Sequence, residues 1–246
     1  MKGCDSPSIV WFSAGCTSAV AAKIATGRYK DSVVYYIDTG SHHPDSLRFL
    51  HDCENWFGCP IHILSQKKFS SHWDVIEKTR YINGTAGARC TLELKKKVRY
   101  DLEDSLCNWN RQILGFSIEE QRRAKLFREQ YPKAKAEFPL IEEGLSKPDC
   151  LAILRKCGIK VPIMYELGFH NNNCIGCVKG GKGYWSAIRK HFPDAFLRMS
   201  IIEHEIGHSC INGCYLSDLP ADYPITNPIV ESCSLWCDVE FLRNEV

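Results

Sequence analysis

The sequence lacks long hydrophobic runs: nowhere do eighteen apolar residues follow one another, so no segment predicts a membrane-spanning helix. The apolar run that follows the N-terminal Met1-Lys2 is too short to predict a signal peptide. The chain also lacks a large excess of either sign of charge, because 31 Lys and Arg against 29 Asp and Glu leave a formal charge of +2. That balance gives no global attraction to nucleic acid. We therefore expect a cytoplasmic protein that does not use a membrane as a partner.

Internal repeats and low-complexity tracts are absent as well, whereas cysteine is abundant. The 246 residues suffice for one large core, with or without a small appended region, and they include 14 cysteines. Because the sequence shows no export signal, we expect the chain in a reducing compartment, which disfavours disulfides. We expect the cysteines to be core residues, metal ligands or reactive thiols.

Short apolar segments alternate with helical patterns along the first part of the chain. Residues 8–12, 32–37 and 61–64 have the composition of buried strands, and residues 44–57 have helical periodicity between them. This alternation predicts an α/β fold in which helices flank a parallel β-sheet. We expect a domain over residues 1–170 and, packed on it, an irregular Cys-rich C-terminal region over residues 171–246.

Residues 13–18 are small and separate the first predicted strand from a helix. Such a loop suits phosphate, because small residues let backbone N–H groups approach the anion and the helix N-terminus lies behind it. The alternative is an ordinary strand-to-helix turn. In parallel sheets ligands bind at the carboxyl ends of the strands, where Ser13 and Asp38 are expected.

Comparison with known families makes the interpretation of residues 13–18 more specific. Its sequence resembles the pyrophosphate-binding loop Ser-Gly-Gly-x-Asp-Ser of the PP-loop ATP pyrophosphatases, with Ser13, Gly15 and Ser18 matching. Ala14 replaces a glycine and Thr17 replaces the acidic residue. The loop is therefore similar to a PP-loop that lacks its acidic side chain.

Two further motifs follow in the family's order. Asp38-Thr39-Gly40 is similar to its Asp-Thr-Gly segment, and residues 90–95, Cys-Thr-Leu-Glu-Leu-Lys, resemble its Cys-Thr-x-x-Leu-Lys box. A weaker match is the Gly-x-x-x-x-Glu-x-x-Arg segment that begins at Gly115. The chain as a whole most resembles the sulfonucleotide (PAPS/APS) reductase branch.

The resemblance implies an adenine nucleotide alpha-hydrolase-like, Rossmann-like fold that binds ATP, or PAPS/APS, with Mg²⁺. The residues that it implies for nucleotide binding are Ser13, Gly15, Cys16, Thr17, Ser18, Asp38, Thr39, Lys95 and Arg123.

Cys174 and Cys177 form a Cys-x-x-Cys pair, whose thiolates can converge on one metal or cluster. A redox-active pair and a plain pair of loop cysteines are the alternatives. In cluster-bearing sulfonucleotide reductases, a Cys-Cys pair and a Cys-x-x-Cys pair together hold a [4Fe–4S] cluster. Here Cys90-Thr91 resembles the first pair, so the resemblance implies three ligands, as in tRNA-thiolating PP-loop enzymes whose open iron can carry sulfur. Zinc at these cysteines stays an alternative.

The C-terminal region adds further candidates. Cys210 and Cys214, with Cys233 and Cys237, could form a zinc site. PAPS reductases carry a nucleophilic cysteine in a Glu-Cys-Gly-x-His tail, and the similar position here is Cys233, which we take as the candidate catalytic residue. Residues 204–208 fit His-Glu-x-x-His, the pattern of a zinc peptidase helix, although Gly207 weakens that helix.

Three hypotheses follow. In the first, a sulfurtransferase adenylates an acceptor and then thiolates it; in the second, an oxidoreductase reduces PAPS or APS. In the third, a regulatory module binds nucleotide or metal without turnover. We expect as partners tRNA or another sulfur acceptor, a sulfur donor or thioredoxin-type reductant, and a second copy in a homodimer. The basic and aromatic residues that suit a nucleic acid acceptor are Lys179, Lys182, Tyr184, Trp185, Arg189 and Lys190.

Overall fold

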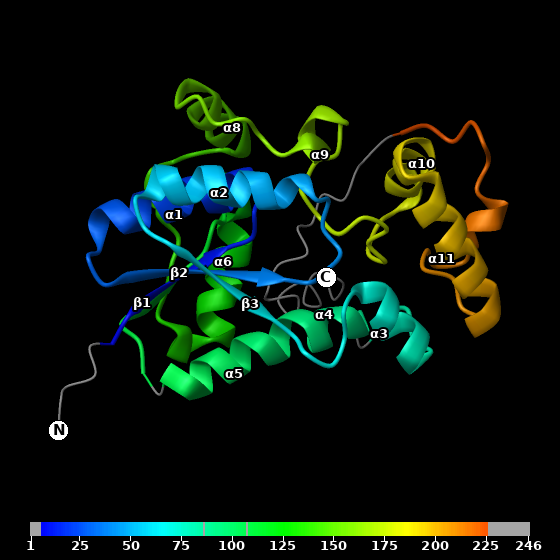
Figure 1. Ribbon diagram of the computed structural model, residues 1–246, viewed down its shortest axis with the longest axis horizontal. Helices are drawn as coiled ribbons and strands as arrows, with labels where there is room; N and C mark the ends of the chain where they lie inside the picture. Colours follow the sequence, from blue (N-terminus) through cyan, green and yellow to red (C-terminus); the bar gives the residue numbers. More distant parts are fainter. Residues whose placement is uncertain (1–5, 86, 107, 226–246) are drawn as a thin grey trace.

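The computed structural model describes residues 6–85, 87–106 and 108–225. At its centre is a five-stranded parallel sheet with the order β3-β2-β1-β4-β5 (Figure 1). The strands are β1 (Ser8–Phe12), β2 (Ser32–Asp38), β3 (Ile61–Ser65), β4 (Arg111–Ile113) and β5 (Ala136–Glu137). Every residue of β1 is buried, as expected for a central strand covered on both faces. The predicted parallel α/β fold is confirmed.

Helices connect the strands and make up most of the remaining structure. The α-helices are α1 (Cys16–Arg28), α2 (Asp45–Phe57), α3 (His72–Thr79), α4 (Arg89–Thr91), α5 (Lys97–Leu106), α6 (Gln121–Gln130), α7 (Pro139–Glu142), α8 (Lys147–Lys156), α9 (Ile163–Glu166), α10 (Lys182–His191) and α11 (Pro193–Ile206). The other helices are the π-helix η1 (Leu92–Lys96) and the 3₁₀ turns η2 (Ile118–Glu120), η3 (Pro132–Ala134) and η4 (Leu216–Asp218). In the described part of the chain, no helix is long and apolar enough to cross a membrane.

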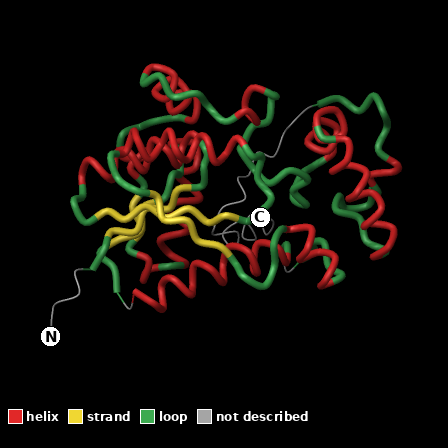
Figure 2. The backbone as a smooth tube through the Cα atoms, in the orientation of Figure 1, coloured by secondary structure: helices red, strands yellow, loops and turns green. Residues whose placement is uncertain are grey.

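Alternate side chains of the central strands point to opposite faces of the sheet. Phe12 and Tyr36 pack in the core beneath α1, α2 and α8, whereas Trp11 and Tyr35 pack in the core formed with α5 and α6. Figures 1 and 2 show α1 and α2 above the strands and α5 below them. The sheet is therefore the middle of three layers.

A third core lies beyond the carboxyl ends of β1 and β2. It joins α10, α11 and η4 to side chains from α3 and from residues 82–88 (Figure 1). Helices α10 and α11 make up most of residues 182–206, and residues 207–225 contain η4 and one isolated bridge between Ile211 and Cys214. The domain boundary at residue 170 stays a prediction.

Candidate nucleotide and cysteine site

The loop over residues 13–18 follows β1 at its carboxyl end and is organised by Ser18. The Ser18 Oγ atom accepts from the Ser13 N–H (3.1 Å) and the Gly15 N–H (3.3 Å), and it donates to Gly15 O (3.0 Å). The Ser13 hydroxyl also bonds to Ser18 Oγ, at 3.0 Å. Ala14 has φ 57°, a left-handed conformation that favours the glycine of the family pattern. The loop therefore takes a tight turn in spite of the Ala14 replacement.

Gly115 supports this loop from below. A Cβ atom at Gly115 would lie 2.6 Å from Ser18 Cα and 2.7 Å from Ser18 N. The chain that leaves β4 thus passes directly against the first turn of α1. This close approach explains a glycine two residues beyond the end of β4.

Sequence reasoning missed two residues beside the loop, Tyr165 on α9 and Lys147 in the first turn of α8. The Cys16 N–H, at the start of α1, donates to the Tyr165 hydroxyl at 3.1 Å. Lys147 Nζ lies 5.5 Å from the centre of the Tyr165 ring. The capping pattern from Ser146 to Asp149 could have placed Lys147 in a helix start. No local signal indicates that α8 and α9 face residues 13–18.

At the end of β2, Asp38 and Thr39 turn the chain toward the third core. The Asp38 carboxylate accepts from the Gly40 N–H at 2.8 Å. Gly40 has φ +62°, and a Cβ there would lie 1.9 Å from Ser70 O, so only glycine fits. The Thr39 Oγ1 atom shares a 3.3 Å hydrogen bond with Cys174 Sγ. Thr39 therefore joins the strand end to the cysteine loop.

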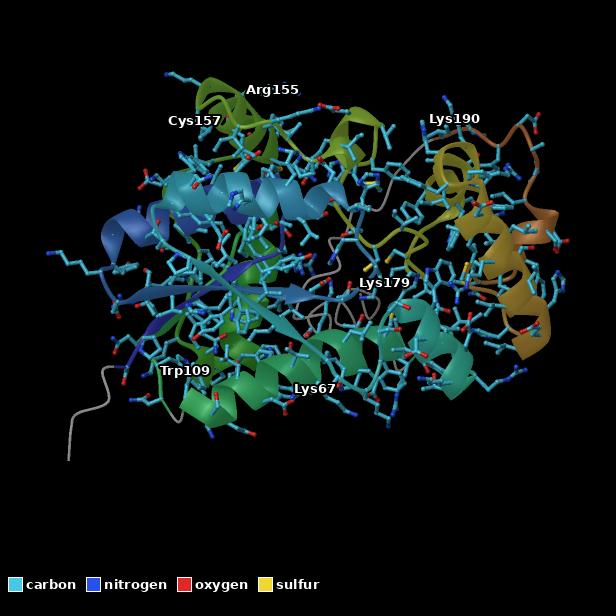
Figure 3. The ribbon with its side chains drawn as sticks, in the orientation of Figure 1. Lys67, Trp109, Arg155, Cys157, Lys179 and Lys190 are labelled. Atoms are coloured by element: carbon cyan, nitrogen blue, oxygen red, sulfur yellow. The ribbon has the colours of Figure 1, made fainter. Side chains whose placement is uncertain are left out.

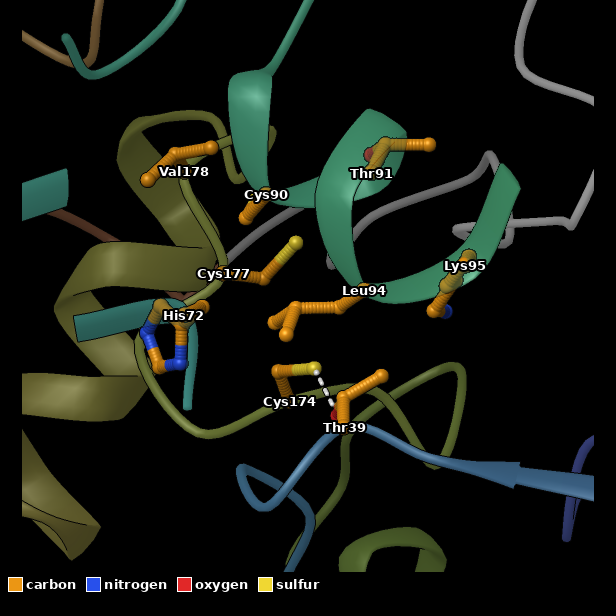
Figure 4. Close-up of a pocket in the computed structure, with 9 residues that line it drawn as sticks. All are labelled: Thr39, His72, Cys90, Thr91, Leu94, Lys95, Cys174, Cys177 and Val178. Carbon is orange, nitrogen blue, oxygen red and sulfur yellow. Dashed lines mark hydrogen bonds between the residues drawn. The ribbon is translucent and has the colours of Figure 1, made fainter. Parts of the chain in front are cut away.

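Cys90, Cys174 and Cys177 lie around one small cavity of about 20 Å³ (Figure 4). Cys174 and Cys177 are buried, and Cys90 is half-buried. The complete lining is Thr39, His72, Cys90, Thr91, Leu94, Lys95, Cys174, Cys177 and Val178. The three cysteines that sequence alone had grouped thus come together from two distant segments.

The Cys-x-x-Cys loop is held by buried contacts. The Tyr184 hydroxyl accepts from Cys177 N–H and donates to Cys174 O, both at 2.9 Å. Gly176 has φ +78°, and a Cβ there would lie 2.7 Å from the Trp73 ring. These contacts fix the backbone on which both thiols are carried.

The three thiols suit an iron–sulfur cluster in their chemistry, because [4Fe–4S] clusters are held by cysteine thiolates. Within the described ranges, no three His, Cys, Asp or Glu side chains are close enough to hold a single metal ion. The cavity has room for about one water molecule, and Leu94 projects toward the same space as Cys174 and Cys177 (Figure 4). The donor set suits a cluster in its chemistry, and a bound cluster stays a prediction.

The two predicted nucleotide-binding cations differ in their surroundings. Lys95 is buried at the end of the π-helix η1 and faces the cysteine cavity. Arg123 is 4% exposed, pairs with Glu120 at 2.6 Å and lies 4.3 Å from the centre of the Phe116 ring. A role for Arg123 in nucleotide binding stays a prediction.

The prediction that Tyr184 and Trp185 belong to a nucleic acid surface is wrong. Tyr184 and Trp185 are buried in the third core, at 2% and 0% exposed, so they cannot stack on bases. Arg189 donates to Leu219 O at 2.8 Å, which gives it a structural role. Lys190 is exposed on α10 (Figure 3).

The His-Glu-x-x-His segment does not form the face of a helix. Helix α11 ends at Ile206 because Gly207, with φ 76°, caps it in the left-handed conformation, and His208 lies beyond the helix. Glu203 is the buried carboxylate instead, and it accepts from the N–H groups of Cys210 (2.6 Å) and Leu216 (2.7 Å). The peptidase hypothesis is wrong.

The other C-terminal candidates remain untested. Cys233 and Cys237 lie outside the described residues. Cys210 is buried, and burial raises the pKa of its thiol. Zinc at the C-terminal cysteines and catalysis by Cys233 stay predictions.

Comparison with known proteins identifies the fold. No protein-family model matches the sequence, and no curated protein is significantly similar to it. The structure is similar to phosphoadenylyl-sulfate (PAPS) reductase from Candida auris in its phosphate complex, with TM-score 0.50 and 14% identity over 68% of this chain and 81% of that chain. At that identity the similarity establishes architecture alone. The chain therefore has a fold similar to that of PAPS reductase.

Proposed function

We propose that the chain is a PP-loop enzyme that binds an adenine nucleotide at the carboxyl ends of β1 and β2 and transfers sulfur beside Cys90, Cys174 and Cys177. One observation carries the proposal. The hydrogen bond between Thr39 and Cys174 joins the β2 end to the cysteine cavity, so nucleotide and thiols would share one site. The site lies where ligands of parallel sheets bind, at the carboxyl ends of the strands, and the similar PAPS reductase was solved as a phosphate complex.

The first step would activate an acceptor oxygen. That oxygen attacks the α-phosphorus of ATP, the bond to the bridging oxygen of the β-phosphate breaks, and pyrophosphate leaves. The N–H groups of residues 13–18 and the α1 N-terminus would stabilise the departing pyrophosphate, with Mg²⁺ as counterion. A sulfide-level sulfur then attacks the adenylated carbon, and AMP leaves with the oxygen.

Cys90, Cys174 and Cys177 would hold a [4Fe–4S] cluster. When bound through three cysteines, such a cluster supplies an iron with an open coordination position for sulfur. Thr39 donates to or accepts from the Cys174 sulfur, and buried Lys95 lines the same cavity. These residues would orient the sulfur atom and exclude water from it.

PAPS or APS reduction is the second candidate, and the fold similarity favours it. In that reaction a thiolate, for which Cys233 is the candidate, attacks the sulfonate sulfur and the nucleotide phosphate leaves. A thioredoxin-type dithiol then reduces the S-sulfocysteine, releases sulfite and is itself oxidised to a disulfide.

The products distinguish these reactions. We would incubate anaerobically purified protein with Mg²⁺ and labelled ATP, unfractionated tRNA and sulfide, and in parallel with PAPS and reduced thioredoxin. AMP and pyrophosphate formed only with acceptor support thiolation, whereas sulfite from PAPS supports reduction. Tight nucleotide binding with neither product would leave the regulatory module and refute both enzymes.

A further inference from the structure

We propose that Lys147 is a phosphate-binding residue of the nucleotide site, and that Tyr165 occupies the place of a phosphate oxygen at the start of α1. The ligand class is the di- or triphosphate chain of an adenine nucleotide. This inference rests on the proposed nucleotide site and adds a wall to it from α8 and α9, opposite residues 13–18.

The first argument is the charge of Lys147. Its ammonium is half-buried and donates to neutral oxygens, His170 O and Asn171 Oδ1, the latter at 2.5 Å. Burial lowers the pKa of Lys147, whereas the charges of Glu119 and Glu120 act in the opposite sense, and Glu119 Oε1 accepts from the Lys147 backbone N–H at 3.2 Å. In the part of the chain that the structure describes, no carboxylate forms an ion pair with Lys147. An ammonium that bonds only to neutral oxygens suits an anionic ligand.

The second argument is the position of the charge relative to the loop. Burial raises the pKa of the Cys16 thiol and the nearby charge of Lys147 opposes that rise, while Lys147 Nζ lies 5.5 Å from the Tyr165 ring centre. The Tyr165 hydroxyl accepts from Cys16 N–H, one of the N–H groups that an α-helix cannot satisfy internally. A phosphate oxygen is a stronger acceptor than a phenol, because it carries charge. It would therefore replace the hydroxyl at Cys16 and approach Lys147.

The third argument is a buried polar atom without a partner in the segment after α9. Asn172 is 5% exposed, and its Nδ2 donates to Ala14 O (2.8 Å) and Ser46 Oγ (3.0 Å). Its Oδ1 has no donor among the described residues. Buried acceptors are normally satisfied, so Asn172 Oδ1 offers a place for an ordered water, such as one that hydrates a bound phosphate chain.

The replacement at Thr17 fits a phosphate-binding role for Lys147. The family loop carries an acid where this chain has Thr17, so a cation near the loop meets no loop carboxylate. Lys147 therefore remains available to the phosphates rather than pairing with position 17.

Calorimetry with inorganic pyrophosphate and with ATP tests the inference on the full chain. Lys147→Gln keeps a donor but removes the charge, and Lys147→Arg keeps the charge. Lys156→Met, on the exposed last turn of the same helix, is the matched control. We expect Lys147→Gln to weaken both ligands by about tenfold or more, with Lys147→Arg close to wild type. The control should equal wild type, and thermal midpoints and circular dichroism establish that each variant is folded.

The outcomes separate the two proposals. Wild-type binding of ATP that Lys147→Gln leaves unchanged overturns the role of Lys147 and leaves the proposed function standing. Equal losses in Lys147→Gln and Lys147→Arg also overturn it, because charge would not be the cause. Absence of any pyrophosphate or nucleotide binding by wild type overturns both proposals.

Discussion

Replacing Gly115 by alanine tests how closely the chain after β4 packs against the loop over residues 13–18. The new methyl group would lie 2.6 Å from Ser18 Cα, 2.7 Å from Ser18 N and 3.0 Å from Thr17 C. All three are backbone atoms, so no side chain can rotate away, and the loop or the chain after β4 must move. Overpacking of this kind typically costs about 1–3 kcal/mol of folding free energy. For a chain of this size, about 2 kcal/mol corresponds to a Tm lower by roughly 4–8 °C.

Gly27→Ala is the matched control for Gly115→Ala. Gly27 lies within α1, is exposed, and has no heavy atom within 4 Å of its would-be Cβ. There alanine should stabilise the helix by about 0.5–1 kcal/mol. Differential scanning calorimetry compares the variants, and calorimetric titration with ATP should show weaker binding only for Gly115→Ala. A Tm for Gly115→Ala equal to that of wild type would refute the packing account of the loop.

Two further predictions concern α9 and the cysteine cavity. Hydrogen bonds from Arg48 and from the Ile163 N–H lower the pKa of the Asp45 carboxyl in the folded protein. The ionised carboxylate therefore stabilises the folded state at pH values above its unfolded pKa of about 4. This stabilisation is lost as the pH falls through the folded pKa. Asp45→Asn should therefore lower the unfolding free energy by about 1.5–3 kcal/mol in urea at pH 7, with a smaller difference near pH 3; a difference independent of pH contradicts this. In protein loaded with a cluster, Thr39→Val removes the hydroxyl that bonds to Cys174 Sγ, so the reduction potential should fall while Thr39→Ser retains it. Spectroscopically monitored redox titration measures this, and an unchanged potential in Thr39→Val contradicts it.

Local patterns predicted the central strands and the motifs well. Residues 8–12, 32–37 and 61–64 are mostly apolar, and the structure has β1, β2 and β3 at those places. The family motif at Cys90 and the spacing of Cys174 and Cys177 grouped the three cysteines before any geometry was available. Because each signal lies within a few residues, the sequence could carry it.

Contacts between distant segments could not be read in that way. Lys147 and Tyr165 meet residues 13–18 only through the packing of α8 and α9, which no periodicity encodes. Tyr184 and Trp185 show the opposite failure, because an aromatic and basic neighbourhood proved to be core. Gly207 ends α11 and separates the two histidines of the peptidase pattern, as its low helix propensity indicated.

Chemical analysis tests most directly whether Cys90, Cys174 and Cys177 hold the proposed iron–sulfur cluster. Iron, acid-labile sulfide, zinc and the visible spectrum would be measured on protein purified without oxygen, for wild type, Cys174→Ala and Cys157→Ala. Cys157 is exposed at the end of α8 and serves as the control (Figure 3). We predict iron and sulfide with broad absorbance near about 400 nm in wild type and Cys157→Ala, and their loss in Cys174→Ala. Zinc without sulfide, or iron retained equally in both variants, would contradict the account.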